Sequence, residues 1–326
     1  MAKPTPKQPS KHSRVPGKRP TLLLAVDFSK PSQVALEAAG RFARDLGADV
    51  ILLHASPRAP APMPLARVKD EKVTAGRLAA SDAARLSSEW AEHLRADGLR
   101  VQTENPVGPP VKEILDAAKR HGCRAIVLGT TGRTGVKGWL LGSVAREIVR
   151  RSKVPVLVAP TRMGTAESPS KVILVAVDFS AGSEPAYEAG LRLAHDIKAP
   201  VHLLHVVNLV LPSVPLPYSG IEFTPAMLEK DQEGAFAELA ELASRARKLK
   251  VGVTPSVGVG HPASVILAEA RLIGASLIVI GTHGKSASHR FFLGSVAESV
   301  VQLADRPVLV VPDPKGPDAG EWQRSA

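Results

Sequence analysis

The sequence predicts an α/β protein of two tandem, Rossmann-like units, each a doubly wound parallel sheet of five strands. Three observations predict this fold. Apolar strand-like segments alternate with longer helix-like segments, the strand-like segments show no polar alternation, and the whole pattern occurs twice. Strands that are buried on both faces read as continuous apolar runs, as parallel strands between two helix layers do.

The duplication is visible in four pairs of segments. Leu22 corresponds to Ile173, 151 residues later, and Gly142 corresponds to Gly294, 152 residues later. Because only one residue is inserted over a whole unit, the two folds must match closely, and so long a period indicates domain duplication. The matched pairs are 22–29 with 173–180, 50–54 with 201–205, 141–145 with 293–297, and 154–160 with 306–312.

Each unit is expected to begin with an apolar strand, a helix and a second strand. A Pro-rich stretch, a long helix of mixed polarity, a short strand and another helix follow. A fourth strand then ends at a glycine motif, and a last helix and an edge strand close the unit. In the first half these elements are expected at 22–26, 32–46, 49–54, 69–96, 100–104, 110–121, 125–128, 144–151 and 155–158. In the second half they are expected at 172–177, 184–197, 200–206, 226–249, 250–255, 262–273, 277–280, 296–303 and 307–310.

The predicted units span 21–161 and 171–313, joined by a linker at 162–170 that contains Gly164 and Pro169. Residues 1–20 carry six basic residues, five prolines and no acidic residue, which predicts a disordered basic tail. Residues 314–326 form a second tail. A solvated N-terminal tail is favoured over one that binds nucleic acid or anionic lipid, because no aromatic residues are interleaved with the basic ones.

The composition favours a globular protein of the cytoplasm. Apolar residues make up 44% of the chain and charged residues 22%, and the net charge of +11 is concentrated in the first half and its tail. Cys123 is the only cysteine, so no internal disulfide can form, which suits a reducing compartment. No apolar run reaches the roughly 18 residues that a membrane span needs.

A glycine motif follows the fourth predicted strand of each half. It reads Gly129-Thr-Thr-Gly132, nine residues, then Gly142-Ser143, and again Gly281-Thr-His-Gly284, nine residues, then Gly294-Ser295. Paired glycines let the backbone approach a ligand closely, and a helix start leaves N–H groups aimed at an anion. The motif therefore predicts a phosphate-binding loop in each half.

Two simpler interpretations of this motif stay open. The glycines could serve only a tight turn after the strand. The serines could be ordinary helix caps, and Ser295 is expected to form a capping box with Glu298. Capping is compatible with phosphate binding, because the hydroxyl and the backbone amides serve different partners.

The doubled motif resembles the nucleotide-binding signature of the universal stress protein family. Asp27-Phe28-Ser29 and Asp178-Phe179-Ser180 after the first strands, and the closing Pro-Val-Leu-Val segments, add to the resemblance. It covers nearly the whole chain apart from the tails. The resemblance implies a strand order of 3-2-1-4-5, in which strands 1 and 4 are neighbours at the switch point where doubly wound sheets bind ligands. It also implies ATP or another adenine nucleotide as ligand. Mg²⁺ is expected only as a companion of bound ATP, through its phosphates.

The resemblance also implies roles for individual residues. Asp27 and Asp178 are expected to accept a hydrogen bond from the ribose or the adenine edge. The base is expected beside Ala25, Val26 and Ala55 in the first half, and beside Ala176, Val177 and Val206 in the second. The phosphates are expected at Gly129, Gly132, Gly142, Ser143 and Val144, and at Gly281, Gly284, Gly294, Ser295 and Val296.

The two copies differ beside the second glycine of the motif. The second half has His283, as family members often do, whereas the first half has Thr131, so equal affinity of the two sites is not expected. A basic residue follows this glycine in both halves. Arg133 offers a bidentate fork to phosphate oxygens, and Lys285 offers a point charge.

These features favour a nucleotide-binding stress-response or regulatory module over a dedicated catalyst. No catalytic residue and no metal site is assigned, because Asp27 and Asp178 are the only acidic residues at the strand ends. Two alternatives stay open, a slow ATPase or nucleotide α-hydrolase on the same sheet and a nucleotide-free scaffold. The edge strands 155–158 and 307–310 are expected to pair within the chain as a pseudo-dimer, and a homodimer of whole chains is a further expectation.

Overall fold

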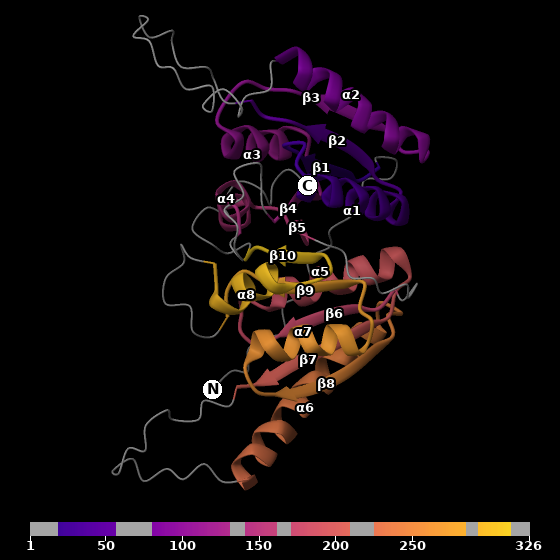
Figure 1. Cartoon of the computed structure of the whole chain (residues 1–326). Helices are drawn as coiled ribbons and strands as arrows, with labels where there is room; N and C mark the ends of the chain where they lie inside the picture. The colour runs from indigo at the N-terminus through magenta and orange to yellow at the C-terminus, as the bar shows by residue number, and fades with distance from the viewer. Residues whose placement is uncertain are drawn as a thin grey trace, which may run out of the picture.

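The computed structural model describes residues 19–56, 80–130, 141–161, 171–208, 225–284 and 293–313. These residues form two successive runs of alternating strands and helices, one in each half of the chain (Figure 1). The first run is β1 (Thr21–Ala25), α1 (Lys30–Leu46), β2 (Asp49–Leu53), α2 (Ala80–Ala96), β3 (Val101–Glu104), α3 (Pro110–Arg120), β4 (Ala125–Gly129), α4 (Ser143–Arg151) and β5 (Val156–Ala159). The second run is β6 (Ile173–Val177), α5 (Glu184–Ile197), β7 (Val201–Val207), α6 (Pro225–Arg247), β8 (Val253–Val259), α7 (Pro262–Leu272), β9 (Leu277–Gly281), α8 (Ser295–Leu303) and β10 (Val308–Val311).

The ten strands form one continuous sheet in the order β3-β2-β1-β4-β5-β10-β9-β6-β7-β8. All pairs within a half are parallel, which confirms the predicted α/β fold class. The halves join where β5 and β10 pair antiparallel, with Val158 opposite Val308 and Val156 opposite Val310. The two predicted sheets are thus fused into one, because each would otherwise end in a strand with unpaired backbone groups.

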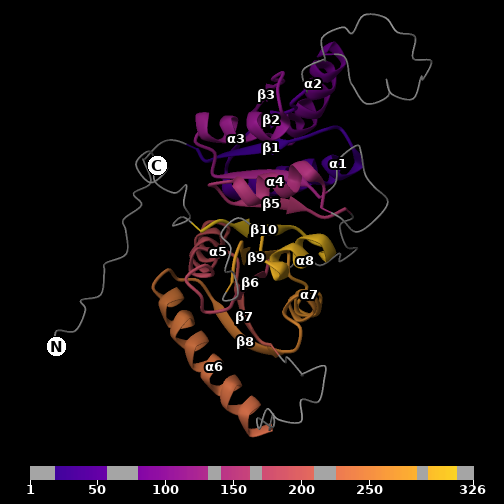
Figure 2. The ribbon, with the colours of Figure 1, turned by 90° about the vertical axis from the view of Figure 1, so that its left-hand side faces the viewer.

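Helices cover both faces of this sheet. Helices α1, α2, α5 and α6 contribute to one hydrophobic cluster, and α3, α4, α7 and α8 contribute to another on the opposite face. Figure 2 shows α6 and α7 on opposite sides of the second half. Strand β1 supplies both clusters, since Leu22 and Leu24 belong to the first and Leu23 to the second, all at 2% exposure or less. This two-sided burial explains why the strands lack polar alternation.

Some element boundaries differ from the sequence prediction. Strand β8 was expected at 250–255 but begins at Val253, because Lys250 adopts a left-handed conformation (φ 56°) just after α6. It continues to Val259 because β7 is long enough to pair with it along its whole length, from Val201 to Val207. Helix α2 is described from Ala80 onward, so the predicted start of this helix, the linker, residues 1–18 of the first tail and the whole second tail lie outside the described residues.

Side-chain ion pairs also connect the two halves. Arg124, just before β4, donates to Asp196 on α5 at 2.6 Å. On the other face of the sheet, Arg146 on α4 lies 3.6 Å from Glu298 on α8. The two halves are therefore linked by backbone pairing at the centre of the sheet and by a charged pair on each face. No helix in the described part of the chain combines the length and the apolar character needed to cross a bilayer.

Cys123 lies in the core and makes no disulfide. Burial, with a smaller effect of the Glu104 carboxylate, raises the pKa of its thiol to about 11. Because the folded-state pKa is raised, the neutral thiol favours the folded state at neutral pH. That contribution is lost as the pH rises from the ordinary thiol pKa through about 11.

We therefore predict that native protein at pH 8 reacts with Ellman's reagent on the order of a hundredfold more slowly than protein unfolded in guanidinium chloride. Because the chain has a single cysteine, the release of the coloured thiolate reports this site alone. Cys123→Ala, which removes the thiol, serves as the blank. Equal rates in the native and unfolded states would contradict the buried placement.

Candidate functional site

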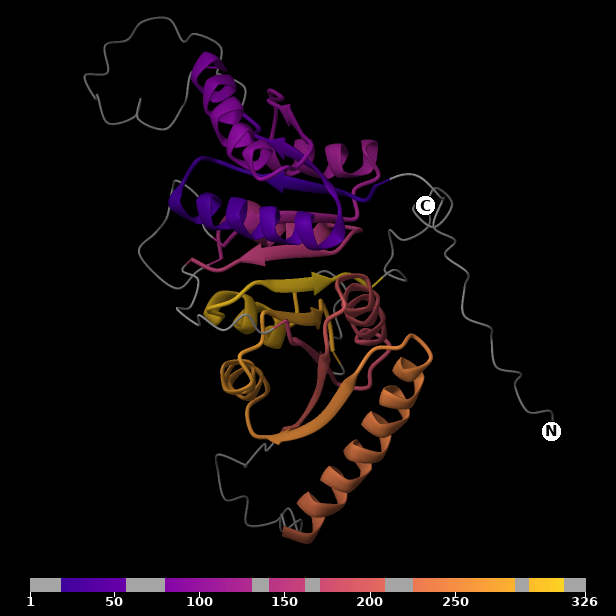
Figure 3. The same ribbon diagram turned by 90° about the vertical axis from the view of Figure 1, so that its right-hand side faces the viewer.

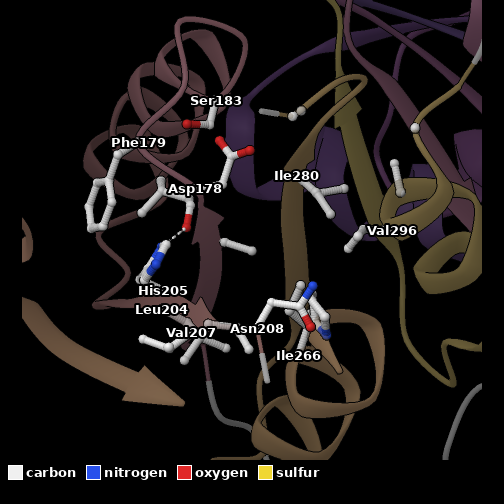
Figure 4. Close-up of a pocket in the computed structure, with 18 of the residues that line it drawn as sticks. Asp178, Phe179, Ser183, Leu204, His205, Val207, Asn208, Ile266, Ile280 and Val296 are labelled. Atoms are coloured by element: carbon white, nitrogen blue, oxygen red, sulfur yellow. Dashed lines mark hydrogen bonds between the residues drawn. The ribbon is translucent and has the colours of Figure 1, made fainter. Parts of the chain in front are cut away.

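A cavity of about 910 Å³ lies at the carboxyl ends of β6 and β9, in the second half (Figure 4). These two strands are neighbours in the sheet, with Leu174 beside Ile278. The strand after β6 in sequence, β7, lies on the far side of β6, and the strand after β9, β10, lies on the far side of β9. Such a point of reversal leaves a crevice between the loops that follow the strands. Ten of the residues predicted for a ligand site line this cavity: Ala176, Val177, Asp178, Val206, Gly281, His283, Gly284, Gly294, Ser295 and Val296.

Asp178 follows β6 and is held by the turn after it. Its Oδ1 accepts hydrogen bonds from the Ser180 amide at 3.0 Å and from the Ser180 hydroxyl at 2.5 Å. This turn places Phe179 in a left-handed conformation (φ 59°), which costs roughly 1–3 kcal/mol for a non-glycine residue. Figure 4 shows the Asp178 carboxylate between β6 and β9. The two hydrogen bonds from Ser180 thus hold the carboxylate at the cavity wall.

The Phe179 ring packs against the ring of a histidine. It stacks on the His205 ring with centroids 4.3 Å apart, and His205 donates from Nδ1 to the Val177 carbonyl at 2.8 Å. The first half repeats both contacts, with Phe28 (φ 61°) 4.7 Å from His54 and His54 Nδ1 donating to Val26 at 2.8 Å. His54 therefore links β2 to the end of β1, and His205 links β7 to the end of β6.

Glycines are needed in the loop after β9 because the backbone comes too close for a side chain. A Cβ at Gly281 would lie 2.8 Å from the Gly182 carbonyl oxygen. A Cβ at Gly284 would lie 2.5 Å from Oδ2 of Asp178. The glycine loop and the aspartate are thus in direct contact, as their places in the sequence predicted. The simple-turn interpretation does not account for this, since the crowding is between two segments that are far apart in the chain.

Helix α8 begins at the cavity with Gly294 as its N-cap. The first bond of the helix runs from the Glu298 amide to the Gly294 carbonyl at 2.9 Å, so the amides of Ser295, Val296 and Ala297 have no partner within the helix. The predicted capping box is wrong. Ser295 is the first helical residue and caps nothing, and the Glu298 side chain contacts Gln302 and Arg146 instead. All three amides belong to residues that line the cavity.

His283 carries a polar atom without a partner. Its Nδ1 lies 2.9 Å from the Thr282 hydroxyl, whereas its Nε2 is buried and has no hydrogen-bond partner among the described residues. An unpaired buried polar atom is costly, roughly 1–3 kcal/mol. A bound polar ligand would recover part of that cost.

Helix α6 contributes residues that sequence reasoning missed. Lys230, Asp231 and Glu238 line the mouth of the cavity, and Asn208 lies beyond the end of β7. The expectation of a single acidic residue per site was therefore incomplete. Asp231, Ala235 and Glu238 recur at helical spacing, so the sequence showed that they share a face. It did not show that this face covers the crevice between β6 and β9.

The first half holds the corresponding residues in a similar arrangement. Oδ1 of Asp27 accepts from the Ser29 amide at 3.1 Å, from the Ser29 hydroxyl at 2.5 Å and from the Ser32 hydroxyl at 2.6 Å. The second half lacks the third of these bonds, since Ser183 donates to the Ser180 carbonyl. A Cβ at Gly129 would lie 2.7 Å from the Pro31 carbonyl oxygen.

The remaining first-half residues take equivalent places. Ala25 ends β1 and Val26 follows it, and Ala55 lies just beyond β2. Ser143 and Val144 begin α4 after its N-cap, Gly142. The Gly142 amide donates to the Thr130 carbonyl at 2.7 Å, as Gly294 does to Thr282 at 2.8 Å. Thr131, Gly132, Arg133 and Lys285 lie outside the described residues. Within the described ranges, no group of three metal-ligating side chains is gathered at one point.

Together these features define a class of protein, a tandem α/β chain with a ligand-sized cavity at the switch point of its sheet. The model of the universal stress protein family matches residues 18–160 and again 169–312. The chain therefore belongs to the universal stress protein family.

Individual relatives agree with this assignment. A universal stress protein of Mycolicibacterium smegmatis is 28% identical over 302 residues, which is 89% of this chain and 96% of that protein. A universal stress protein of Methanocaldococcus jannaschii is 35% identical over 146 residues, or 44% of this chain and 84% of that protein. The crystal structure of a universal stress protein from Archaeoglobus fulgidus shares the fold, with a TM-score of 0.65 and 24% identity, covering 90% of this chain and 96% of that one.

The contact between Gly281 and the loop after β6 predicts a measurable cost of substitution. Gly281→Ala should lower the free energy of unfolding by roughly 1–3 kcal/mol, because its Cβ meets a backbone oxygen that cannot easily move. Gly252→Ala is the matched control, since a Cβ there meets nothing within 4 Å. Urea unfolding followed by circular dichroism would measure both. Equal stabilities of the two variants would contradict the close approach.

Proposed function

We propose that this chain binds an adenine nucleotide, with ATP as the first candidate, as a stress-response or regulatory module and not as a dedicated enzyme. The observation that carries this proposal is the cavity of about 910 Å³ in which an apolar wall, a fixed carboxylate and the start of a helix meet. Its volume falls within the roughly 300–1,000 Å³ of pockets that bind small organic ligands.

The walls of the cavity divide into parts that suit the parts of a nucleotide. Leu204, Val206, Ile266 and Ile280 provide an apolar surface for the base. Asp178, whose Oδ1 is already held by Ser180, is suited to accept from ribose hydroxyls. The residues predicted to lie beside the base, Ala176 and Val177, end β6 next to this carboxylate.

The start of α8 is suited to phosphate. The amides of Ser295, Val296 and Ala297 have no partner within the helix, and a helix N-terminus stabilises an anion by roughly 0.3–1 kcal/mol, and up to about 2 kcal/mol when partly buried. Nε2 of His283 adds a polar atom that needs a partner. Gly281, Gly284 and Gly294 keep the loop free of side chains that would fill this space.

We extend the proposal to the first half, as a second nucleotide site built from Ala25, Val26, Asp27, Ala55 and the loop from Gly129 to Val144. The shared geometry at Asp27 and Gly129 supports it. Thr131 replaces the histidine and Asp27 accepts a third hydrogen bond, so we expect the first-half site to have a different affinity. Arg133 and Lys285 are proposed phosphate contacts, and Mg²⁺ would accompany the nucleotide through phosphate oxygens.

We propose that the two sites belong to separate units, 21–161 and 171–313, which act as a pseudo-dimer. The antiparallel pairing of β5 with β10 and the ion pairs Arg124–Asp196 and Arg146–Glu298 support this. Whole chains are proposed to form a homodimer in addition. Light scattering at micromolar concentration tests this last step, and a mass equal to one chain would overturn it.

We predict that Gly284→Val weakens ATP binding by roughly ten- to a hundredfold, because overpacking costs on the order of 1–3 kcal/mol and any Cβ there meets Asp178. Isothermal titration of ATP into the full chain measures the loss. Gly252→Val, with open space around its Cβ, is the matched control and should bind like the parent. If the parent itself gives no saturable heat, or Gly284→Val binds as well as the parent, the proposal fails.

A slow ATPase is the second candidate, and the acidic residues of α6 favour testing it. Asp231 and Glu238 at the mouth could hold Mg²⁺ or orient water. Under our main proposal, the parent and Asp231→Asn release phosphate at the same rate. That rate equals the background measured with the Gly284→Val variant. Steady release by the parent, abolished in Asp231→Asn with ATP binding retained, would instead establish the enzyme.

A further inference from the structure

A second cavity, of about 300 Å³, lies at the junction of the two halves. Residues at the amino ends of β1, β4 and β5 line it, together with α1 from the first half and α5 and β10 from the second. Its strand residues Leu22, Leu157 and Leu309 belong to the hydrophobic cluster on the α1 and α5 face of the sheet. Figure 3 shows α1 and α5 on the two sides of the β5–β10 junction.

The interior of this junction cavity is apolar. Leu22, Leu157 and Leu309 are strand residues of the wall, each no more than 8% exposed. Phe42 on α1 and Leu193 on α5 enclose the space from the helix layer. Because both halves supply wall residues, the cavity exists only when β5 and β10 are paired.

Three cationic side chains line the same cavity, namely Arg124, Lys153 and Arg192. Two of them have acidic partners on α5, since Arg124 pairs with Asp196 at 2.6 Å and Arg192 with Glu188 at 3.3 Å. Lys153 is exposed and makes no ion pair with any described residue. The cavity therefore combines an apolar interior with a surplus positive charge at its solvent-exposed rim.

The duplication shows that the fold itself does not require this combination. The counterpart of Ala125 is Leu277, a larger side chain that is 1% exposed. The counterparts of Arg124 and Lys153 are Ser276 and Asp305, and Asp305 pairs with Arg271 at 3.0 Å and Arg306 at 2.8 Å. The first copy thus has a small residue and a lysine without an ion pair among the described residues, where the second copy has a larger residue and an aspartate paired with two arginines.

We propose that the junction cavity binds the aliphatic carboxylate of a medium-chain fatty acid. The alkyl chain would lie against Leu22, Leu157 and Leu309, and the carboxylate would pair with Lys153 and extend to Arg124. Burial of methylene groups drives binding, and the head group adds a charge-assisted contact. A cavity of this volume is at the lower limit for organic ligands, which favours a single short chain over a nucleotide.

Alkyl cations are disfavoured because Lys153 would repel them, and neutral alcohols would lack the ionic contact. This inference is independent of the nucleotide proposal, since the two cavities share no lining residue.

Isothermal titration of the full chain with octanoate, octanol and octyltrimethylammonium tests the proposal. We expect octanoate to bind at one site per chain, octanol to bind about fivefold more weakly and the cation to bind more weakly than octanol. Ala125→Leu, which introduces the residue of the second copy, should abolish octanoate binding by filling the cavity. Thermal unfolding of this variant checks that it still folds.

Lys153→Asp keeps the proposal testable if Ala125→Leu is unstable, because Lys153 is exposed and outside the core. It should weaken octanoate about fivefold or more and leave octanol unchanged. Lys248→Asp, the same charge reversal at an exposed residue that does not line the cavity, should bind octanoate like the parent. Failure of the parent to bind octanoate, or equal octanoate affinity in Lys153→Asp and Lys248→Asp, would overturn the proposal.

Discussion

The close contact between the Asp178 carboxylate and the backbone at Gly284 is the constraint on which the site depends. A single added carbon at Gly284 would lie 2.5 Å from Oδ2 of Asp178. The contact is possible only because β6 and β9 are adjacent in the sheet, so that the loops after both strands leave the same edge. The turn after β6 holds the carboxylate and the loop after β9 holds the glycine, and the start of α8 then faces the space between them.

Duplication gives the chain a second copy of the turn that holds the carboxylate, at Asp27, and a new surface between the halves. The pairing of β5 with β10 removes one exposed edge from each half and makes the halves one sheet. The two copies nevertheless differ at single positions. Asp27 accepts an extra hydrogen bond, Thr131 stands where the second copy has His283, and Ala125 stands where it has Leu277. The two halves are therefore equivalent in topology and different in chemistry.

Much of the fold could be predicted from the sequence because its signals are local. Unbroken apolar strands, the alternation with helices and the doubled glycine motif specify the α/β class, and Asp178 and the glycines gather as their places after neighbouring strands imply. Other features depend on contacts between segments that the sequence alone does not bring together. The face of α6 that carries Asp231 and Glu238 shows its helical spacing, but only the packed structure sets it over the cavity. The extent of β8 depends on the length of β7, and the true N-cap of α8 depends on the loop that holds Gly294.

The central claim is that main-chain amides at the start of α8, opposite Asp178, hold the phosphates of a nucleotide. An NMR titration of isotope-labelled protein with ATP tests it most directly, because each backbone amide reports its own environment. Our account predicts saturable shifts of the Ser295, Val296 and Ala297 amides, with smaller shifts at the edge strand β3. If ATP leaves these three amides unmoved, or shifts only residues remote from Asp178 and Gly284, the account is wrong.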